Sequence, residues 1–117
     1  MPLGGGKKPL TVLLQIDAFT SAVRADKYFV AGYFMRGYHQ IALRGLGKAL
    51  QDYDNAANFM RGNAVIDYTQ LGLACKVYYA EIMFNRGMVQ FLMNRQQQAF
   101  EDLAMVRHRI ATTLATL

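Results

Sequence analysis

The sequence lacks several features that define common classes of protein. It contains a single cysteine, Cys75, which excludes an internal disulfide and a zinc site built from several cysteines. No apolar run approaches the roughly 18 residues that a membrane-spanning helix requires. Residues 1–9 carry a glycine and lysine run without the apolar core of a secretory signal. We therefore predict a soluble, cytoplasmic chain that does not insert into membranes, with a flexible N-terminal arm over residues 1–9.

Patterns typical of catalysis and metal binding are missing as well. His39 and His108 lie far apart, and neither has a cysteine or carboxylate three or four residues further on. The sequence has no glycine-rich phosphate loop and no nucleophile elbow. We predict a protein that is not an enzyme and that uses neither a metal nor a cofactor.

The formal net charge of +5 comes from basic residues scattered along the chain. A positive charge suits an acidic protein surface, a nucleic acid or an anionic membrane, and does not choose among them. Because the sequence has no dense basic cluster and no recognisable nucleic-acid-binding fold, we expect no nucleic-acid partner.

Most of the chain shows helical periodicity. Leu10–Arg24 has apolar residues at helical spacing and no proline, which predicts an amphipathic helix. After a short break at residues 25–27, a new pattern starts at Val30. With Val30 as position 1, positions 4, 8, 20, 24 and 27 hold Tyr33, Gly37, Ala49, Tyr53 and Ala56. This is the pattern of a tetratricopeptide repeat, in which small residues at positions 8 and 20 let two helices pack closely.

The same five positions recur downstream, where they hold Met83, Gly87, Ala99, Leu103 and Val106. The two copies are 50 residues apart, as from Gly37 to Gly87. The tetratricopeptide period is about 34 residues, so roughly 16 extra residues separate the copies. Subtraction places this insertion at residues 64–79. Reading backwards, Phe19 and Ala22 occupy positions 24 and 27 of an earlier repeat, so we expect the sequence to begin in mid-repeat.

These periods predict an all-α fold, a tetratricopeptide-like helical solenoid with a hairpin or loop inserted between two repeats. The expected units are a half repeat at 10–29, a repeat at 30–63, the insertion at 64–79, a repeat at 80–113 and a short C-terminal cap. The first full repeat would have helices over about residues 28–43 and 48–60, joined by a turn at Arg44–Gly47 whose glycines supply the backbone dihedrals. So short an array leaves apolar surface at its N-terminal end, which also predicts self-association.

The insertion itself fits more than one structure. Strand-forming residues flank Gly72, which favours a hairpin or a compact loop. Leu71, Leu73 and Ala74 could instead extend the following helix forward. An insertion at the edge of a helical stack can carry binding residues on a rigid scaffold, and this position favours the hairpin or loop.

Several segments resemble one protein family. The matching segments are Ala18–Thr20, Asp26–Lys27, Tyr33–Phe34, Arg36–Gly37, Arg61–Asn63, Ile66–Tyr68 and Leu71–Leu73. They closely resemble the tetratricopeptide domain of the cytosolic activator subunit of phagocyte NADPH oxidase and its fungal regulator counterparts. The likeness runs from about residue 15 to residue 106, and the run from Arg61 to Tyr68 is its most specific part.

The resemblance implies a partner and a set of contact residues. Members of this family bind the active, GTP-loaded form of a Rac-type small GTPase through the insertion and the loops between repeats. The complex works with other NADPH oxidase components to generate superoxide. By position, the implied GTPase contacts are Asp26, Tyr28, Arg61, Asn63, Val65 and Asp67. Tyr28 stands where the human-type sequence has a histidine. Arg61 offers five planar donors, and Asp67 can accept hydrogen bonds.

Two alternatives remain open. Arg61 could bond to carbonyl groups at a helix end, and Asp67 could cap the turn at Leu71–Gly72, which would make both residues structural. The module could also bind a peptide segment in its concave groove, with Asn85 and Tyr38 as groove residues and the insertion merely structural.

Overall fold

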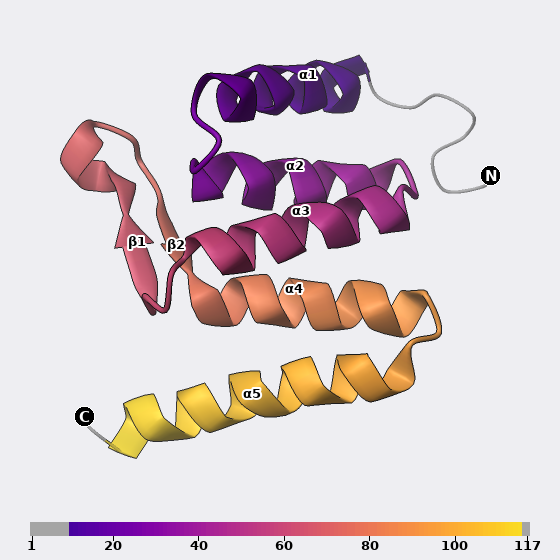
Figure 1. The fold of residues 1–117 in the computed structure, drawn as a ribbon, viewed down its shortest axis with the longest axis vertical. Coiled ribbons are helices and arrows are strands. Elements are labelled where there is room, and N and C mark those ends of the chain that lie inside the picture. The colour runs from indigo at the N-terminus through magenta and orange to yellow at the C-terminus, as the bar shows by residue number, and fades with distance from the viewer. Residues whose placement is uncertain (1–9, 116–117) are drawn as a thin grey trace.

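The computed structural model describes residues 10–115 and arranges them as five α-helices and a short two-stranded sheet (Figure 1). The elements are α1 (Leu10–Ala25), α2 (Val30–Ala42), α3 (Leu46–Phe59), β1 (Val65–Asp67), the 3-10 helix η1 (Tyr68–Leu71), β2 (Lys76–Tyr78), α4 (Tyr79–Leu92) and α5 (Gln96–Ala115). The predicted arm at residues 1–9 lies outside the described residues. None of the described helices is both long and apolar enough to span a bilayer.

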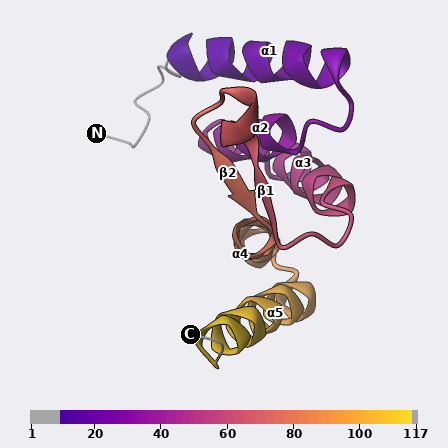
Figure 2. The same cartoon turned by 90° about the vertical axis from the view of Figure 1, so that its left-hand side faces the viewer.

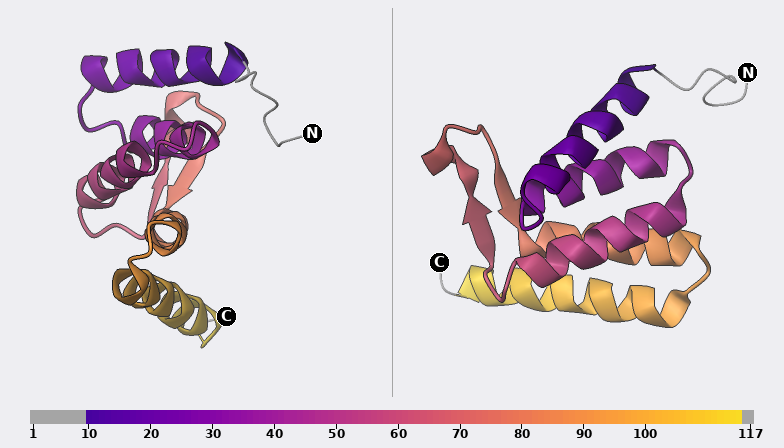
Figure 3. Two further views of the ribbon diagram at one scale, coloured as in Figure 1. Left: turned by 90° about the vertical axis from the view of Figure 1, so that its right-hand side faces the viewer. Right: turned by 45° about the horizontal axis from the view of Figure 1, so that its top comes forward.

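The helices form one stack in which each packs against the next helix in the chain (Figures 1 and 3). The insertion does not interrupt this stack, because α3 still packs against α4. The predicted fold class, an all-α helical repeat with a hairpin or loop between two repeats, is confirmed. At the N-terminal end of the stack, Leu10 and Leu14 on α1 are 67% and 56% exposed.

Small residues permit the close packing within each helix pair, as the repeat pattern predicts. An added Cβ at Gly37 would lie 3.1 Å from the ring of Tyr53, and one at Gly87 would lie 3.2 Å from Cγ of Leu103. Ala49 and Tyr53 are fully buried at the α2–α3 contact. A side chain at either glycine would therefore push the two helices of its pair apart.

At the corner between α2 and α3, the positive φ is adopted by a different residue from the glycines that the sequence predicts. At the α2–α3 corner the left-handed residue is Arg44, with φ 59°, whereas Gly45 has φ −83° and Gly47 already lies within α3. The N–H groups of Arg44 and Gly45 donate to the carbonyl oxygens of Ile41 and Gln40. This is a Schellman motif, and the residue after the C-cap takes the positive φ. The prediction that the glycines supply the dihedrals is therefore wrong.

The second corner repeats this geometry, with φ 64° at Asn94. The N–H groups of Asn94 and Arg95 donate to the carbonyl oxygens of Phe91 and Gln90. Asn tolerates the left-handed region well, whereas Arg at the first corner does so at some cost.

An arginine at position 7 of each repeat links three helices, which the sequence pattern does not reveal. Arg36 on α2 donates from Nη2 to Oδ1 of Asp52 at 2.7 Å, and from Nη1 to Oγ1 of Thr20 on α1 at 3.2 Å. Its side-chain bonds to the buried Asp52 also include Nε. Arg36 thus ties the α2–α3 pair to the preceding helix.

In the second repeat, Arg86 on α4 makes the equivalent contacts. Its Nη2 and Nε donate to the two carboxylate oxygens of Asp102 on α5, each at 2.8 Å. Its Nη1 donates to Oδ1 of Asp54 on α3 at 3.2 Å. The group that binds Nη1 of the arginine from the preceding helix is therefore a carboxylate in the second repeat and a hydroxyl in the first.

The insertion folds as a hairpin, so the alternative in which it extends the next helix is excluded. Strands β1 and β2 pair antiparallel, with Val65 opposite Tyr78, Ile66 opposite Val77 and Asp67 opposite Lys76. Between the strands, η1 ends at Gly72, whose φ of 85° is readily adopted by glycine. We call residues 64–78 the insertion hairpin.

Candidate functional site

The insertion hairpin lies across one end of the helical stack, in front of the ends of α2 and α4 (Figure 2). Strand β2 packs against both helices. Ile66 and Val77 face this packed side and contribute to the core. Since side chains alternate along a strand, the neighbours of these two residues point to the opposite face.

A buried tyrosine anchors the hairpin to the corner between α1 and α2. The hydroxyl oxygen of Tyr68 accepts a hydrogen bond from the N–H of Val30 at 3.1 Å. The ring of Tyr68 meets that of Phe29 edge to face, with the centroids 5.3 Å apart. Because Val30 opens α2 and its N-cap residue supplies no side-chain bond, Tyr68 satisfies a helix-end N–H from 38 residues away.

The outward face of the hairpin carries four side chains from both strands. Val65 and Tyr78 face each other and are 42% and 44% exposed. Asp67 and Lys76 form the neighbouring cross-strand pair. The family resemblance points to Val65 and Asp67 but not to Lys76 and Tyr78. The alternation in Lys76-Val77-Tyr78, with the apolar valine in the centre, is the signal that could have found them.

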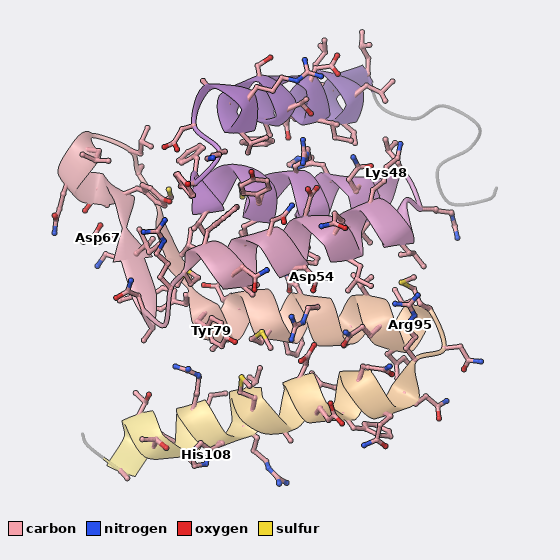
Figure 4. All side chains as sticks on the ribbon, in the orientation of Figure 1. Lys48, Asp54, Asp67, Tyr79, Arg95 and His108 are labelled. Atoms are coloured by element: carbon pink, nitrogen blue, oxygen red, sulfur yellow. The ribbon has the colours of Figure 1, made fainter. Side chains whose placement is uncertain are left out.

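Asp67 has a local structural role as well as an outward position. Its Oδ1 accepts the N–H of Thr69 at 2.9 Å and also the hydroxyl of Thr69, so Asp67 caps η1. These bonds, the hydroxyl first and the N–H second, lower the pKa of Asp67 below its usual value. The carboxylate is therefore ionised at neutral pH. The sequence allowed Asp67 to cap the turn at Leu71–Gly72, and in the structure it caps the chain at Thr69 instead. Figure 4 shows Asp67 on the hairpin, away from the helical stack.

The α1–α2 corner brings a second group of predicted residues to the same end. Oδ1 of Asp26 accepts the N–H of Tyr28 at 3.0 Å. The ring of Tyr28 lies 5.0 Å from Cζ of Arg61 and 5.1 Å from Nζ of Lys27. Phe59 meets the same ring edge on, with the centroids 5.2 Å apart. Tyr28 thus joins this corner to the end of α3.

Arg61 does not use its guanidinium at the end of its own helix. Its backbone takes the left-handed conformation, with φ 53°. No side-chain hydrogen bond or ion pair within residues 10–115 involves its guanidinium, which lies over Tyr28 instead. The alternative in which Arg61 satisfies helix-end carbonyls does not describe this structure, and its donors face solvent.

Asn63 closes the loop that leaves α3. Its side-chain Nδ2 donates to the carbonyl oxygen of the buried Met60 at 2.9 Å, and its backbone N–H donates to the same oxygen at 3.0 Å. The remaining amide oxygen of the exposed Asn63 can still accept a hydrogen bond. Asn63 is therefore partly structural.

The two residues proposed for a peptide groove lie apart from the hairpin, on α4 and α2. Nδ2 of the partly buried Asn85 donates to the hydroxyl of Tyr53 at 3.4 Å. Tyr38 is 60% exposed. Asn85 is therefore already engaged within the fold, whereas Tyr38 is free to contact a ligand. In the described part of the chain, no group of three or more histidine, cysteine or acidic residues could hold a metal ion.

Comparison with known proteins supports the resemblance. No family model matches the chain. The chain is 41% identical over 75 residues to NADPH oxidase activator 1 of Rattus norvegicus, and the matched region covers 64% of this chain and 17% of that protein. It is 38% identical over 73 residues to the NADPH oxidase activator of Dictyostelium discoideum, with 62% of this chain and 12% of that protein covered. Over 89 residues it is 32% identical to neutrophil cytosol factor 2 of Mus musculus, with 76% of this chain and 17% of that protein covered. The chain thus spans less than a fifth of the length of these relatives.

Proposed function

Because this chain is homologous to part of the NADPH oxidase activator and neutrophil cytosol factor 2 proteins, we propose that it is a non-catalytic protein-binding module in NADPH oxidase regulation. We propose further that it recognises the GTP-bound form of a Rac-type small GTPase. The binding edge consists of the α1–α2 corner, the end of α3 and the outward face of the insertion hairpin.

The observation that carries this proposal is the gathering of separate segments at one end of the stack. Tyr28 and Arg61 come from different loops and touch each other. Val65 and Asp67 share the outward face of β1. Tyr68 holds the hairpin against the same α1–α2 corner. A partner that meets this end would contact all of these segments together.

The chemistry of this edge suits recognition of a GTPase switch. Arg61 offers unused planar donors, and the ionised Asp67 offers an acceptor for a backbone N–H or a cation. Val65 and Tyr78 add exposed apolar surface between them. A GTPase presents its switch segments in one fixed geometry only while the γ-phosphate orders them, so such contacts favour the GTP form.

Isothermal titration calorimetry tests the proposal. The chain is titrated with a Rac-type GTPase loaded with a non-hydrolysable GTP analogue or with GDP. We expect binding to the GTP form alone. We also expect loss of binding in Arg61→Glu, which replaces the arginine donors by a negative charge that repels the partner's acceptor groups. The matched control is Arg95→Glu at the exposed α4–α5 corner, which makes the same charge change at the opposite side of the molecule from Asp67 (Figure 4).

The control variant should bind as the parent does. Absence of binding to either nucleotide form, with the helical circular dichroism of the chain intact, would overturn the proposal. Equal losses in Arg61→Glu and Arg95→Glu would show that net charge, rather than the hairpin edge, drives the association.

A second candidate function rests on an exposed apolar stripe on α2 and α4. Tyr38 lies on α2, and residues Phe84, Met88 and Phe91 follow one another at helical spacing on α4, with exposed fractions between 41% and 60%. Such a stripe suits the apolar face of a peptide segment. Peptide binding of this kind would be weakened by Tyr38→Ser and left unchanged by Arg61→Glu. GTPase binding would show the reverse pattern.

A further inference from the structure

A polar cavity lies between α1, α2 and α3, and its lining residues all belong to these three helices rather than to the insertion hairpin. It has a volume of about 240 Å³. Its lining residues are Thr20, Arg36, Gln40, Lys48, Gln51 and Asp52. Figure 4 labels Lys48 at the N-terminal end of α3, at the opposite side of the molecule from Asp67. The cavity is therefore separate from the proposed GTPase edge.

The two repeats differ in charge at these six positions. The equivalent residues of the second repeat are Asp54, Arg86, Gln90, Gln98, Glu101 and Asp102. That set contains one cation and three carboxylates, a net charge of −2, whereas the cavity lining contains two cations and one carboxylate, a net charge of +1. The same backbone frame is thus acidic in one repeat and basic in the other.

Three of the six positions account for this difference in charge, and one of them holds Thr20 in the first repeat and Asp54 in the second. In the second repeat, Oδ1 of Asp54 lies 3.2 Å from Nη1 of Arg86. In the first repeat the same nitrogen of Arg36 meets the neutral hydroxyl of Thr20. The bonds to Asp52 and Thr20 use three of the five N–H groups of Arg36. Two donors remain for a ligand.

Lys48 adds a second cation to the cavity lining. It has no acidic partner within residues 10–115, and it lies in the first turn of α3. The helix dipole places partial positive charge at this end of the helix, so it reinforces the charge of Lys48 rather than offsetting it. An anion in the cavity would relieve this unfavourable arrangement.

We propose that this cavity binds an oxyanion, a phosphate or carboxylate group that lies beside Thr20 and supplies the negative charge which the Asp54 carboxylate supplies in the second repeat. Arg36 and Lys48 supply the charge, and the amides of Gln40 and Gln51 supply further donors. The group could be a free ion or part of a larger ligand, and both present the same oxygens to the cavity.

Nuclear magnetic resonance titration of the chain tests this site. Inorganic phosphate and acetate are added separately at constant ionic strength, with sodium chloride as the reference. We expect saturable shifts of the Arg36 Nε–H and of the Lys48 amide with at least one of the two anions. A dissociation constant in the millimolar range, with anion at ten times that value, would raise Tm by roughly 5 °C or more.

Thr20→Asp rebuilds the arrangement of the second repeat and supplies an internal carboxylate. This variant should remain folded and lose the saturable response. Lys48→Gln should weaken binding about fivefold or more, whereas Lys76→Gln, the same charge change on the hairpin, should not. If Thr20→Asp does not fold, the comparison of Lys48→Gln with Lys76→Gln decides the question.

Non-saturable shifts with both anions, or equal affinity in Lys48→Gln and Lys76→Gln, would overturn the site. A larger response to phosphate than to acetate would assign it to phosphate groups, and the converse would assign it to carboxylates. Addition of a short peptide that carries the preferred group then separates the two sources. Tighter binding than the free ion identifies a peptide-borne group, and equal or weaker binding identifies the free ion.

Discussion

Replacement of Tyr68 by phenylalanine removes the hydroxyl that links the insertion hairpin to α2. The N–H of Val30 loses its acceptor, and Val30 is fully buried, so water cannot replace the lost bond without local opening. A buried donor left unsatisfied costs about 1–3 kcal/mol. The ring contact with Phe29 is retained, so packing contributes little to the loss. We expect the free energy of unfolding to fall by roughly 2 kcal/mol, which lowers Tm by roughly 8 °C in a domain of this size.

Urea denaturation followed by circular dichroism measures the change in stability, and hydrogen exchange at the Val30 amide reports the local effect. Exchange at this amide should accelerate more than exchange at amides in α5. The matched control is Tyr78→Phe, which removes an exposed hydroxyl from the other face of the hairpin. A loss in Tyr68→Phe no larger than in Tyr78→Phe would refute the idea that Tyr68 caps α2.

Three further predictions concern the helical stack. In thermal denaturation, Gly37→Ala should destabilise the fold by roughly 1–3 kcal/mol because its Cβ would crowd the ring of Tyr53. In the same assay, Gly47→Ala should stabilise the fold by roughly 0.5–1 kcal/mol, because this position lies within α3 and an added Cβ meets no atom within 4 Å. Burial raises the pKa of Tyr53 to about 12. The unfolded chain therefore loses this proton first, near pH 10, and stability should fall between pH 10 and 12 by roughly 3 kcal/mol; urea titrations at each pH should show a smaller fall in Tyr53→Phe. Finally, Asp102→Ala should cost roughly 3 kcal/mol because it leaves a half-buried arginine without its main partner. Asp54→Ala, at a more exposed pair, should cost less than about 1 kcal/mol in urea denaturation.

The helices could be predicted because their signals are local and repeated. The spacing of small and large residues around Gly37 recurs around Gly87, and the helix pairs follow those copies closely. Helix bounds shifted by about two residues, so that α2 begins at Val30 rather than at Tyr28. Tyr28 instead lies in the corner, where its ring can reach Arg61. Local propensity does not specify a contact of this kind, because the two residues come from different loops.

Three other features depend on partners that are distant in the sequence. Tyr68 looked like one more strand former, yet its hydroxyl serves α2 across 38 residues. Arg36 and Arg86 are two of the basic residues scattered along the sequence, and in the structure each bonds to a buried carboxylate across a helix pair. At the α2–α3 corner, glycine was the favoured candidate for the positive φ, but the hydrogen-bond pattern of the corner assigns it to Arg44. Composition and periodicity carry no information about such pairings.

The contacts around the α1–α2 corner form a closed chain that determines how the candidate edge behaves. Tyr68 on the hairpin packs on Phe29, and the ring of the adjacent Tyr28 contacts the guanidinium of Arg61. Arg61 follows α3, and the last residue of α3, Phe59, packs on Tyr28. The hairpin is thus held to the corner by a buried hydrogen bond and to α4 by chain continuity. Ordering such a segment before binding lowers the conformational entropy that a partner must overcome. Tyr68→Phe should therefore weaken partner binding as well as stability, although Tyr68 itself lies on the buried face and cannot touch the partner.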